Sequence, residues 1–170
     1  MGQIIPYKSS MPQVDPKALV ASTAAIVGDV VIGEGSSIWF NTVVRGDMGK
    51  VRMGSFTNIQ DNSTIHVMEG QDMTIGDYVT IGHNAVVHCA KIGNNCLIGM
   101  GSVLLGYTEI GDNCVIGADT LLTQHHKIPA NSLVYGNPAR IIRILRDDEV
   151  EAVHESAEKY NLLAQDYMQK

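Results

Sequence analysis

Aromatic side chains are scarce in this sequence, and it has no long apolar run. Aromatic residues make up 5% of the 170 residues, although 45% are hydrophobic, which suits a narrow interior that accepts Val, Ile and Leu better than rings. No apolar run reaches the ~18 residues of a membrane span, and the N-terminus lacks a basic flank followed by an apolar stretch. We therefore expect a soluble single domain in the cytoplasm, with no membrane partner.

An excess of positive charge and a cysteine motif are also missing. The formal net charge is −6, which argues against nucleic acid or an anionic membrane surface as a partner. The three cysteines, Cys89, Cys96 and Cys114, have neither C-x-x-C spacing nor an even count. We interpret Cys96 and Cys114, 18 residues apart, as small packing residues of one column and not as a redox pair.

An aliphatic residue recurs at almost every sixth position of the chain. A helix of 3.6 residues per turn cannot keep a period of six on one side, whereas short strands joined by tight turns can. Successive turns of such a coil stack at the ~4.8 Å spacing of neighbouring strands. The sequence therefore predicts a mainly β protein, a parallel β-helix. The repeated residues are Val14, Val20, Ile26, Ile32, Ile38 and Val44, then Met53, Ile59 and Ile65, then Ile75, Ile81 and Val87, and finally Ile92, Ile98, Leu104, Ile110, Ile116, Leu122, Ile128 and Val134.

This repeat resembles that of the hexapeptide-repeat family. The resemblance implies a left-handed β-helix of triangular cross-section, with three hexads per turn and six to seven turns. We expect this coil to be a domain of residues 1–140, with the repeats over about residues 14–136.

The segment of residues 145–170 has a different pattern. Apolar residues recur there at intervals of three and four, which predicts an amphipathic helix packed on the coil. They are Val150, Val153, Ala157, Tyr160, Ala164 and Tyr167. Asp147 and Asp148 can cap its first turn and complement the helix dipole.

Three histidines occupy informative positions in the repeat. His66 and His88 follow aliphatic residues three hexads apart, so we expect them one above the other on adjacent turns, with Arg45 one turn earlier. Imidazoles at that spacing can converge on one ion at ~2.0–2.1 Å. His83 lies on the preceding face, where it stacks with Asp61. A neighbouring subunit could supply it, which predicts a three-fold symmetric homotrimer with a metal at each interface.

The three imidazoles also indicate which metals could bind. Neutral imidazoles suit Zn²⁺, Fe²⁺ or Co²⁺, and three protein ligands leave a position open for water. A metal with an open position lowers the pKa of its water to ~7 and supplies hydroxide as nucleophile. The pattern therefore indicates a catalytic site. We assign no functional role to His125, His126 or His154.

A closer resemblance rests on the segments VVRGD, NIQDNSTIH and TIGHNAVVH. They are similar to segments of the γ-class carbonic anhydrases, which implies that metal-bound hydroxide attacks carbon dioxide to give bicarbonate at trimer interfaces. The resemblance also implies individual roles. The metal ligands would be His66, His83 and His88; Gln60 would contact the metal-bound water; Arg45 and Asp61 would form an intersubunit ion pair; and Asp47 would be the partner acid in that network.

Two further residues and one missing loop belong to the same resemblance. Glu69 matches a second glutamate of the family, and Tyr160 resembles a tyrosine that some members place near the metal. The family's extended acidic loop is missing, because Met48 follows Asp47 and the break before the next repeat is short. We therefore expect slow or absent turnover under ordinary assay conditions.

Other functions remain compatible with the same coil. One is an acyltransferase that uses a histidine as general base, and another is a metal-dependent thioesterase, both acting on coenzyme A esters. A third is a non-catalytic metal-binding scaffold subunit of a larger assembly. The fold alone does not separate these functions.

Overall fold

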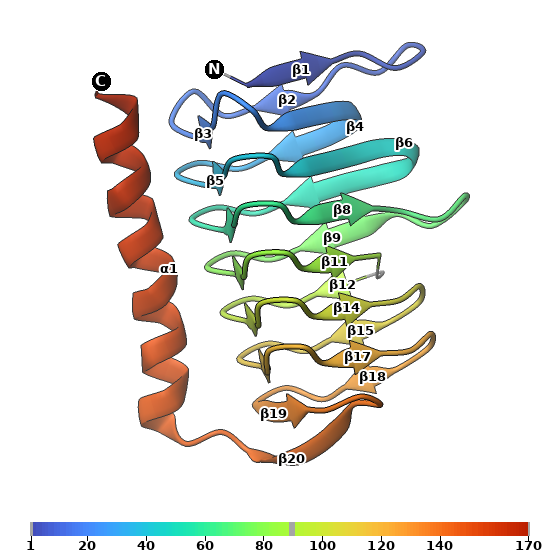
Figure 1. The fold of residues 1–170 in the computed structure, drawn as a ribbon, viewed down its shortest axis with the longest axis vertical. Coiled ribbons are helices and arrows are strands. Elements are labelled where there is room, and N and C mark those ends of the chain that lie inside the picture. The colour runs from blue at the N-terminus through green and yellow to red at the C-terminus, as the bar shows by residue number, and fades with distance from the viewer. Residues whose placement is uncertain (1, 89–90, 170) are drawn as a thin grey trace.

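The computed structural model describes residues 2–88 and 91–169 and shows a left-handed parallel β-helix of about seven turns with one long helix at its side (Figure 1). Cys89 lies outside the described residues. The elements are β1 (Gln3–Ile5), β2 (Gln13–Val14), β3 (Leu19–Val20), β4 (Ala25–Ile32), β5 (Ser37–Ile38), β6 (Val43–Met53), β7 (Asn58–Ile59), β8 (Thr64–His66), β9 (Met73–Ile75), β10 (Thr80–Ile81), β11 (Val86–Val87), β12 (Lys91–Ile92), β13 (Leu97–Ile98), β14 (Val103–Leu104), β15 (Glu109–Ile110), β16 (Val115–Ile116), β17 (Leu121–Leu122), β18 (Lys127–Ile128), β19 (Ser132–Tyr135), β20 (Arg140–Ile144) and α1 (Asp147–Met168).

The strands form the three faces of a prism. The first face contains β8, β11, β14 and β17, and the second contains β9, β12, β15 and β18. The third runs from β3 through β5, β7, β10, β13 and β16 to β19, and β20 closes its end by antiparallel pairing with β19. The other paired strands are parallel, and apart from one shift between β4 and β6 they keep their register, so a residue's place in the repeat determines its place on a face.

Strands β4 and β6 are longer than the short strands that the repeat predicts. Their pairing continues round a corner, from Val27 opposite Arg45 to Gly28 opposite Gly46, and resumes with Val30 opposite Val51. The two strands therefore join the first and second faces into one sheet. The break in the six-residue repeat before Met53 thus lies within a longer strand, whereas the break before Ile75 contains the turn between β8 and β9.

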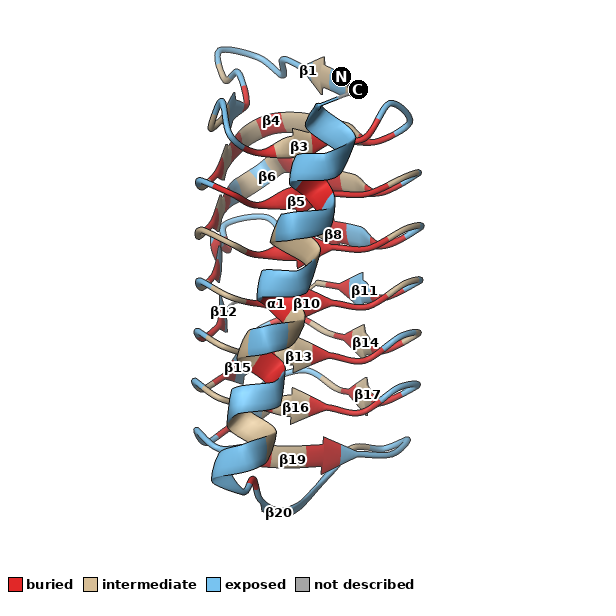
Figure 2. Cartoon of the chain, turned by 90° about the vertical axis from the view of Figure 1, so that its left-hand side faces the viewer, coloured by how far each residue is buried: buried red, intermediate tan, exposed pale blue. Residues whose placement is uncertain are grey.

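The aliphatic residues of the repeat form the core. From Val20 to Val134 every one of them is buried, and Ile26, Ile59 and Ile98 are fully inaccessible. Burial of one such side chain contributes about 1.5–3 kcal/mol, and stacked turns repeat that gain along the prism. Buried segments, red in Figure 2, recur on successive turns of the coil. Cys96 and Cys114 lie in this core, both fully buried and one turn apart.

Asparagines make one corner of the prism possible. Asn41, Asn62 and Asn84 have φ values of 59°, 61° and 58° at successive turns. Asparagine tolerates this left-handed conformation better than most residues, and the Asn41 amide donates to the Asn62 side-chain oxygen at 3.2 Å. The corner before Asn84 presents His83 at the surface.

Helix α1 lies along the third face, where it contacts β3, β5, β7 and β10. Its buried residues are Val153, Ala157 and Ala164, so the predicted periodicity marks the side that faces the coil. Asp147 and Asp148 are in the first turn. The side chain that accepts a backbone N–H there is that of Glu149, from Arg146 at 2.9 Å. In the described part of the chain, no helix is long and apolar enough to cross a membrane.

Candidate metal centre

Arg45, His66 and His88 form a column at the end of the first face. Arg45 of β6 lies opposite His66 of β8, and the pairing of β8 with β11 places His88 one turn further. The two imidazole ring centroids are 5.2 Å apart. The register of the repeat thus brings two ring systems together from residues 22 positions apart.

The His66 ring has a different partner at each nitrogen. Its Nε2 lies 2.9 Å from Asp47 Oδ1, and its Nδ1 lies 3.2 Å from His88 Nε2. The other carboxylate oxygen of Asp47 accepts a hydrogen bond from Arg45 Nη1 at 2.6 Å. These contacts make a continuous chain from Arg45 through Asp47 and His66 to His88.

The spacing of the two histidine nitrogens fits a shared ion. Two ligands at ~2.0–2.1 Å from a tetrahedral metal are roughly 3.3–3.4 Å apart, close to the 3.2 Å between His66 Nδ1 and His88 Nε2. Burial lowers the pKa of His88, and the neighbouring His66 lowers it further. Both effects favour the neutral imidazole, which is the form that binds metal.

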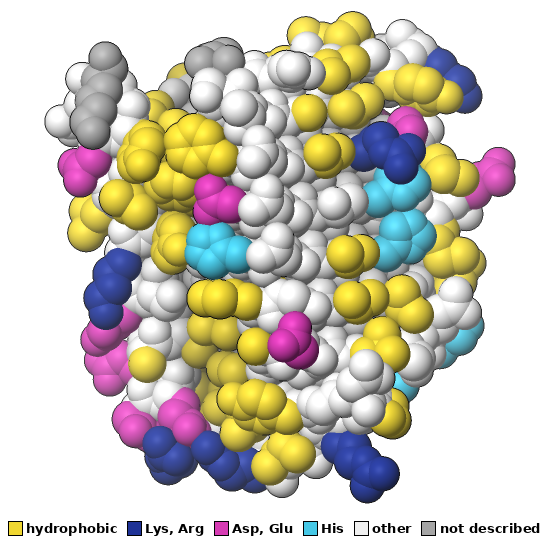
Figure 3. Space-filling view, in the orientation of Figure 1, with side chains coloured by type: hydrophobic (Ala, Val, Ile, Leu, Met, Phe, Trp, Pro, Cys, Tyr) yellow, Lys and Arg dark blue, Asp and Glu magenta, His cyan; other side chains and the backbone are white. Residues whose placement is uncertain are grey.

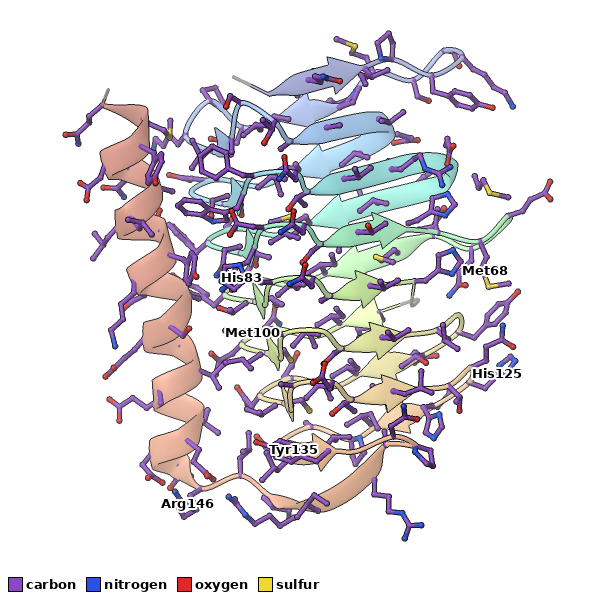
Figure 4. The ribbon with its side chains drawn as sticks, viewed as in Figure 1. Met68, His83, Met100, His125, Tyr135 and Arg146 are labelled. Atoms are coloured by element: carbon purple, nitrogen blue, oxygen red, sulfur yellow. The ribbon has the colours of Figure 1, made fainter. Side chains whose placement is uncertain are left out.

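His83 lies away from this pair, at the opposite end of the first face. Its Nδ1 is 2.9 Å from Asp61 Oδ2, and its side chain is 34% exposed. Figure 4 shows His83 on the side of the coil nearest α1, and in Figure 3 one histidine lies alone toward that side while the other visible histidines lie toward the opposite side. Among residues 2–88 and 91–169, no three His, Cys, Asp or Glu side chains converge as a metal-binding group. One chain therefore brings together two of the three predicted ligands.

A cavity of about 350 Å³ lies beside the His83 corner, between the third face and α1. Gln60 lines it together with Tyr160, and Met100 and Tyr135 line it further along the coil (Figure 4). Gln60 is 4% exposed; its amide nitrogen donates to Asn58 Oδ1 at 3.2 Å, whereas its Oε1 has no partner among the described residues. Burial raises the pKa of Tyr160, so its hydroxyl stays protonated.

The remaining candidates are more dispersed. Glu69 is exposed in the turn after β8, and Met48 is 46% exposed. Sequence reasoning missed Asn58, which is buried and donates to Thr80 Oγ1 at 2.9 Å while it holds Gln60. Its signal was its place at the start of the NIQD segment, two residues before Gln60.

The other three described histidines have partners outside the site. His125 stacks on Tyr107 with centroids 4.8 Å apart. His126 Nδ1 lies 2.9 Å from the carbonyl of Thr123. The His154 ring packs 4.1 Å from that of Tyr78.

Comparison with known proteins gives consistent results. A family model described as "Bacterial transferase hexapeptide (six repeats)" matches residues 89–124. A carbonic anhydrase of Geobacillus kaustophilus is 45% identical over 157 residues, which cover 92% of this chain and 86% of that protein. The mitochondrial gamma carbonic anhydrase 1 of Arabidopsis thaliana is 44% identical over 160 residues, covering 91% of this chain and 58% of the plant protein.

The fold also matches a solved structure closely. A hexapeptide transferase family protein from Anaplasma phagocytophilum superposes with a TM-score of 0.93 and 38% identity, covering 97% of this chain and 98% of that one.

Proposed function

Because this chain belongs to the gamma carbonic anhydrase family of hexapeptide-repeat proteins, we propose that it hydrates carbon dioxide reversibly to bicarbonate at metal centres between the subunits of a homotrimer. The observation that supports this most directly is the 3.2 Å spacing of the His66 and His88 nitrogens. Two imidazoles held that close, one of them with a lowered pKa, are suited to a divalent cation.

The proposed ligands are His66 and His88 of one subunit and His83 of its neighbour. Zn²⁺, Fe²⁺ and Co²⁺ all suit three neutral imidazoles. When bound, the ion supplies the nucleophile by lowering the pKa of a water molecule to ~7. The separation of His83 from the pair within one chain supports a site that a second subunit completes, because closed three-fold symmetry repeats one contact at every interface.

The other residues would position the reactants. Gln60 Oε1, which is buried and lacks a partner among the described residues, can accept a hydrogen bond from the nucleophilic water and so orient it. Asn58 holds the other end of that amide. Asp61 orients the His83 ring through Nδ1, and the protonated Tyr160 hydroxyl lines the same cavity as Gln60.

Two residues bear on the rate of this reaction. The acidic loop that would accept protons near Asp47 is missing, and Met48 follows Asp47 instead. Glu69, the remaining candidate for proton transfer, is exposed in the turn after β8. Proton release to solvent would then limit turnover, so we propose a slow enzyme.

A second candidate function is the hydrolysis or transfer of acyl groups from coenzyme A esters. The cavity of about 350 Å³ has room for roughly ten water-sized groups at ~30 Å³ each, far more than carbon dioxide needs. The match to a hexapeptide transferase family protein supports the same alternative.

Metal content and carbon dioxide hydration, measured on protein purified without air, test the proposal. We expect one metal per chain and hydration above background in the native protein, and loss of both in His88→Ala and in His83→Ala. His125→Ala is the matched control, since that histidine stacks on Tyr107 away from the site and its loss should change neither quantity.

Other results would redirect the proposal. Metal without hydration, together with thioester hydrolysis, would support the second function. Metal without either activity would support a scaffold subunit. An absence of metal from the native protein would contradict the ligand assignment.

A further inference from the structure

Asp47 contacts two groups, one at each oxygen of its carboxylate. Arg45 donates to Oδ2 at 2.6 Å, and His66 Nε2 lies 2.9 Å from Oδ1. Each oxygen therefore has its own partner, and the arginine holds the carboxylate in one orientation. The side chain of Asp47 is only 16% exposed, so its carboxylate is largely shielded from water.

An ionised carboxylate accepts hydrogen bonds and donates none. Asp47 lies between the His66 ring and the Arg45 guanidinium, which donates to Oδ2 at 2.6 Å, and this ion pair keeps the carboxylate in its charged form, which only accepts. The His66 nitrogen that faces Oδ1 must therefore carry the proton. The neutral His66 ring then has Nε2–H toward Asp47 and a bare lone pair on Nδ1, 3.2 Å from His88 Nε2.

We propose that Asp47 is a positioning residue that holds His66 in its Nε2–H tautomer, so that His66 binds the metal through Nδ1 while His88 binds through Nε2. This inference rests on the proposed function, since it assumes the metal centre. It adds the identity of the ligating atoms and the group that selects one of them.

The same arrangement recurs at the third proposed ligand. Asp61 Oδ2 lies 2.9 Å from His83 Nδ1, which leaves His83 Nε2 bare and pointing away from its carboxylate. Ligand histidines commonly donate their second N–H to a carboxylate, which raises their basicity and orients the ring. Two of the three proposed ligands have this support.

Asp47→Asn should change the tautomer of His66, because the amide has one acceptor and one donor group where the carboxylate has two acceptors. Arg45 can only donate, so the single oxygen of the introduced amide turns toward the guanidinium. The NH₂ group then faces His66 Nε2 and donates to it, which moves the imidazole proton to Nδ1. That proton blocks the atom that would bind the metal, although the substituted side chain keeps its size.

Asp29→Asn is the matched control. Asp29 pairs with Arg52 Nη2 at 2.6 Å, the same length as the Arg45–Asp47 pair, and no described histidine contacts it. This variant loses an equivalent arginine–aspartate pair without a change at any proposed ligand.

The test has two readouts, neither of which is activity. Long-range ¹H–¹⁵N NMR of the metal-free protein, at a pH where the rings are neutral, gives the tautomer of His66. Competition with a chelator gives the Zn²⁺ affinity. We expect Nε2–H in the native protein and in Asp29→Asn, and Nδ1–H in Asp47→Asn with Zn²⁺ affinity about 10–100-fold lower.

Each outcome decides the inference. It is overturned if native His66 carries its proton on Nδ1, or if Asp47→Asn binds Zn²⁺ as tightly as Asp29→Asn. The native spectrum tests the tautomer even if Asp47→Asn does not fold. Tight Zn²⁺ binding with the expected tautomer but no carbon dioxide hydration would contradict the proposed function and leave this inference standing, whereas a native protein that binds no Zn²⁺ would contradict both.

Discussion

Small side chains at the corners of the coil repeat one hydrogen bond from turn to turn. Ser63 Oγ donates to the carbonyl of Gly82, and Ser102 Oγ to that of Gly117, both at 2.9 Å. The Cys96 thiol donates in the same way to the carbonyl of Gly111 at 3.1 Å. A thiol in this series therefore takes the place of a hydroxyl.

The reactivity of the buried thiols follows from their surroundings. The neighbouring Cys114 and burial both raise the pKa of Cys96, and a buried protonated thiol reacts slowly. This supports the interpretation of Cys96 as a packing residue. The hydrogen bond with Cys96 lowers the pKa of Cys114, so for Cys114 the same interpretation rests on its complete burial in the core.

At the residue scale we predict that Cys96→Ser is tolerated and Cys96→Val is not. Serine keeps the donor, so the free energy of unfolding should change by less than about 1 kcal/mol. Valine fits by shape, because Val79 is buried one turn earlier in the same column, but it removes the donor to Gly111 and should cost about 1–3 kcal/mol. Urea unfolding at one protein concentration measures both changes. Equal losses in the two variants would show that the thiol does not act as a donor.

At the element scale, α1 is held at both ends. In its C-terminal half, the rings of Tyr160 and Tyr167 pack edge-on against Trp39, with centroids 5.6 and 5.3 Å from the indole. At its start, Glu149 accepts hydrogen bonds from Arg143 Nη1 and Nη2, both at 2.7 Å. The aromatic contact contributes through buried area, whereas the contact at the start depends on charge.

This charge makes the docking of α1 sensitive to acid. The hydrogen bonds from Arg143 and from the backbone of Arg146 lower the pKa of Glu149 from its usual 4.5 to about 2. A carboxylate with a lowered pKa stabilises the fold above its unfolded-state value, and that contribution is lost as the pH falls. Here the loss should run from pH 4.5 down to about 2.

We therefore predict that Glu149→Gln weakens helix docking at neutral pH and removes part of its acid dependence between pH 4.5 and about 2. Trp39, the only tryptophan, reports docking through its fluorescence. Glu151→Gln is the control, because Glu151 is exposed and has no ion pair among the described residues. Identical acid profiles for the two variants would show that Glu149 does not anchor the helix.

At the scale of the whole molecule, the arrangement of the histidines matters more than their number. His66 and His88 share one end of the first face, and His83 is at the other. A chain with this arrangement can donate two ligands to one neighbour and one ligand to the other, so in a closed trimer every interface would be complete.

Mixed trimers test this sharing directly. Neither His83→Ala nor His88→Ala should bind metal alone. When the two are co-expressed in equal amounts, about a quarter of the interfaces should combine the intact His66 and His88 of one variant with the intact His83 of the other, assuming random cyclic assembly. Metal content and hydration should recover to about that fraction.

The control mixture is His66→Ala with His88→Ala. Each variant lacks one of the two histidines, His66 and His88, that a single subunit supplies. No interface therefore has all three ligands, and no recovery of metal binding is expected. Recovery in this mixture, or none in the first, would contradict the division of ligands between subunits.

The sequence alone determined the β-helix and the approximate places of the site residues. Strands that stack in register convert position in the six-residue repeat into position in space, which is why Arg45, His66 and His88 could be placed in one column, and His83 beside Asp61. Helical periodicity likewise identified the side of α1 that faces the coil, on which Val153, Ala157 and Ala164 are buried. The roles of these residues in catalysis remain predictions.

Only the tertiary structure decided which atoms meet. The pairing of Asp47 with His66, the anchoring of α1 by Glu149 instead of Asp147 or Asp148, and the cavity beside Gln60 all depend on side-chain rotamers and on loops outside the repeat. The continuation of β6 across the break depends on its long pairing with β4. A repeat specifies the backbone spacing of its strands, whereas these contacts arise from side-chain directions that no period encodes.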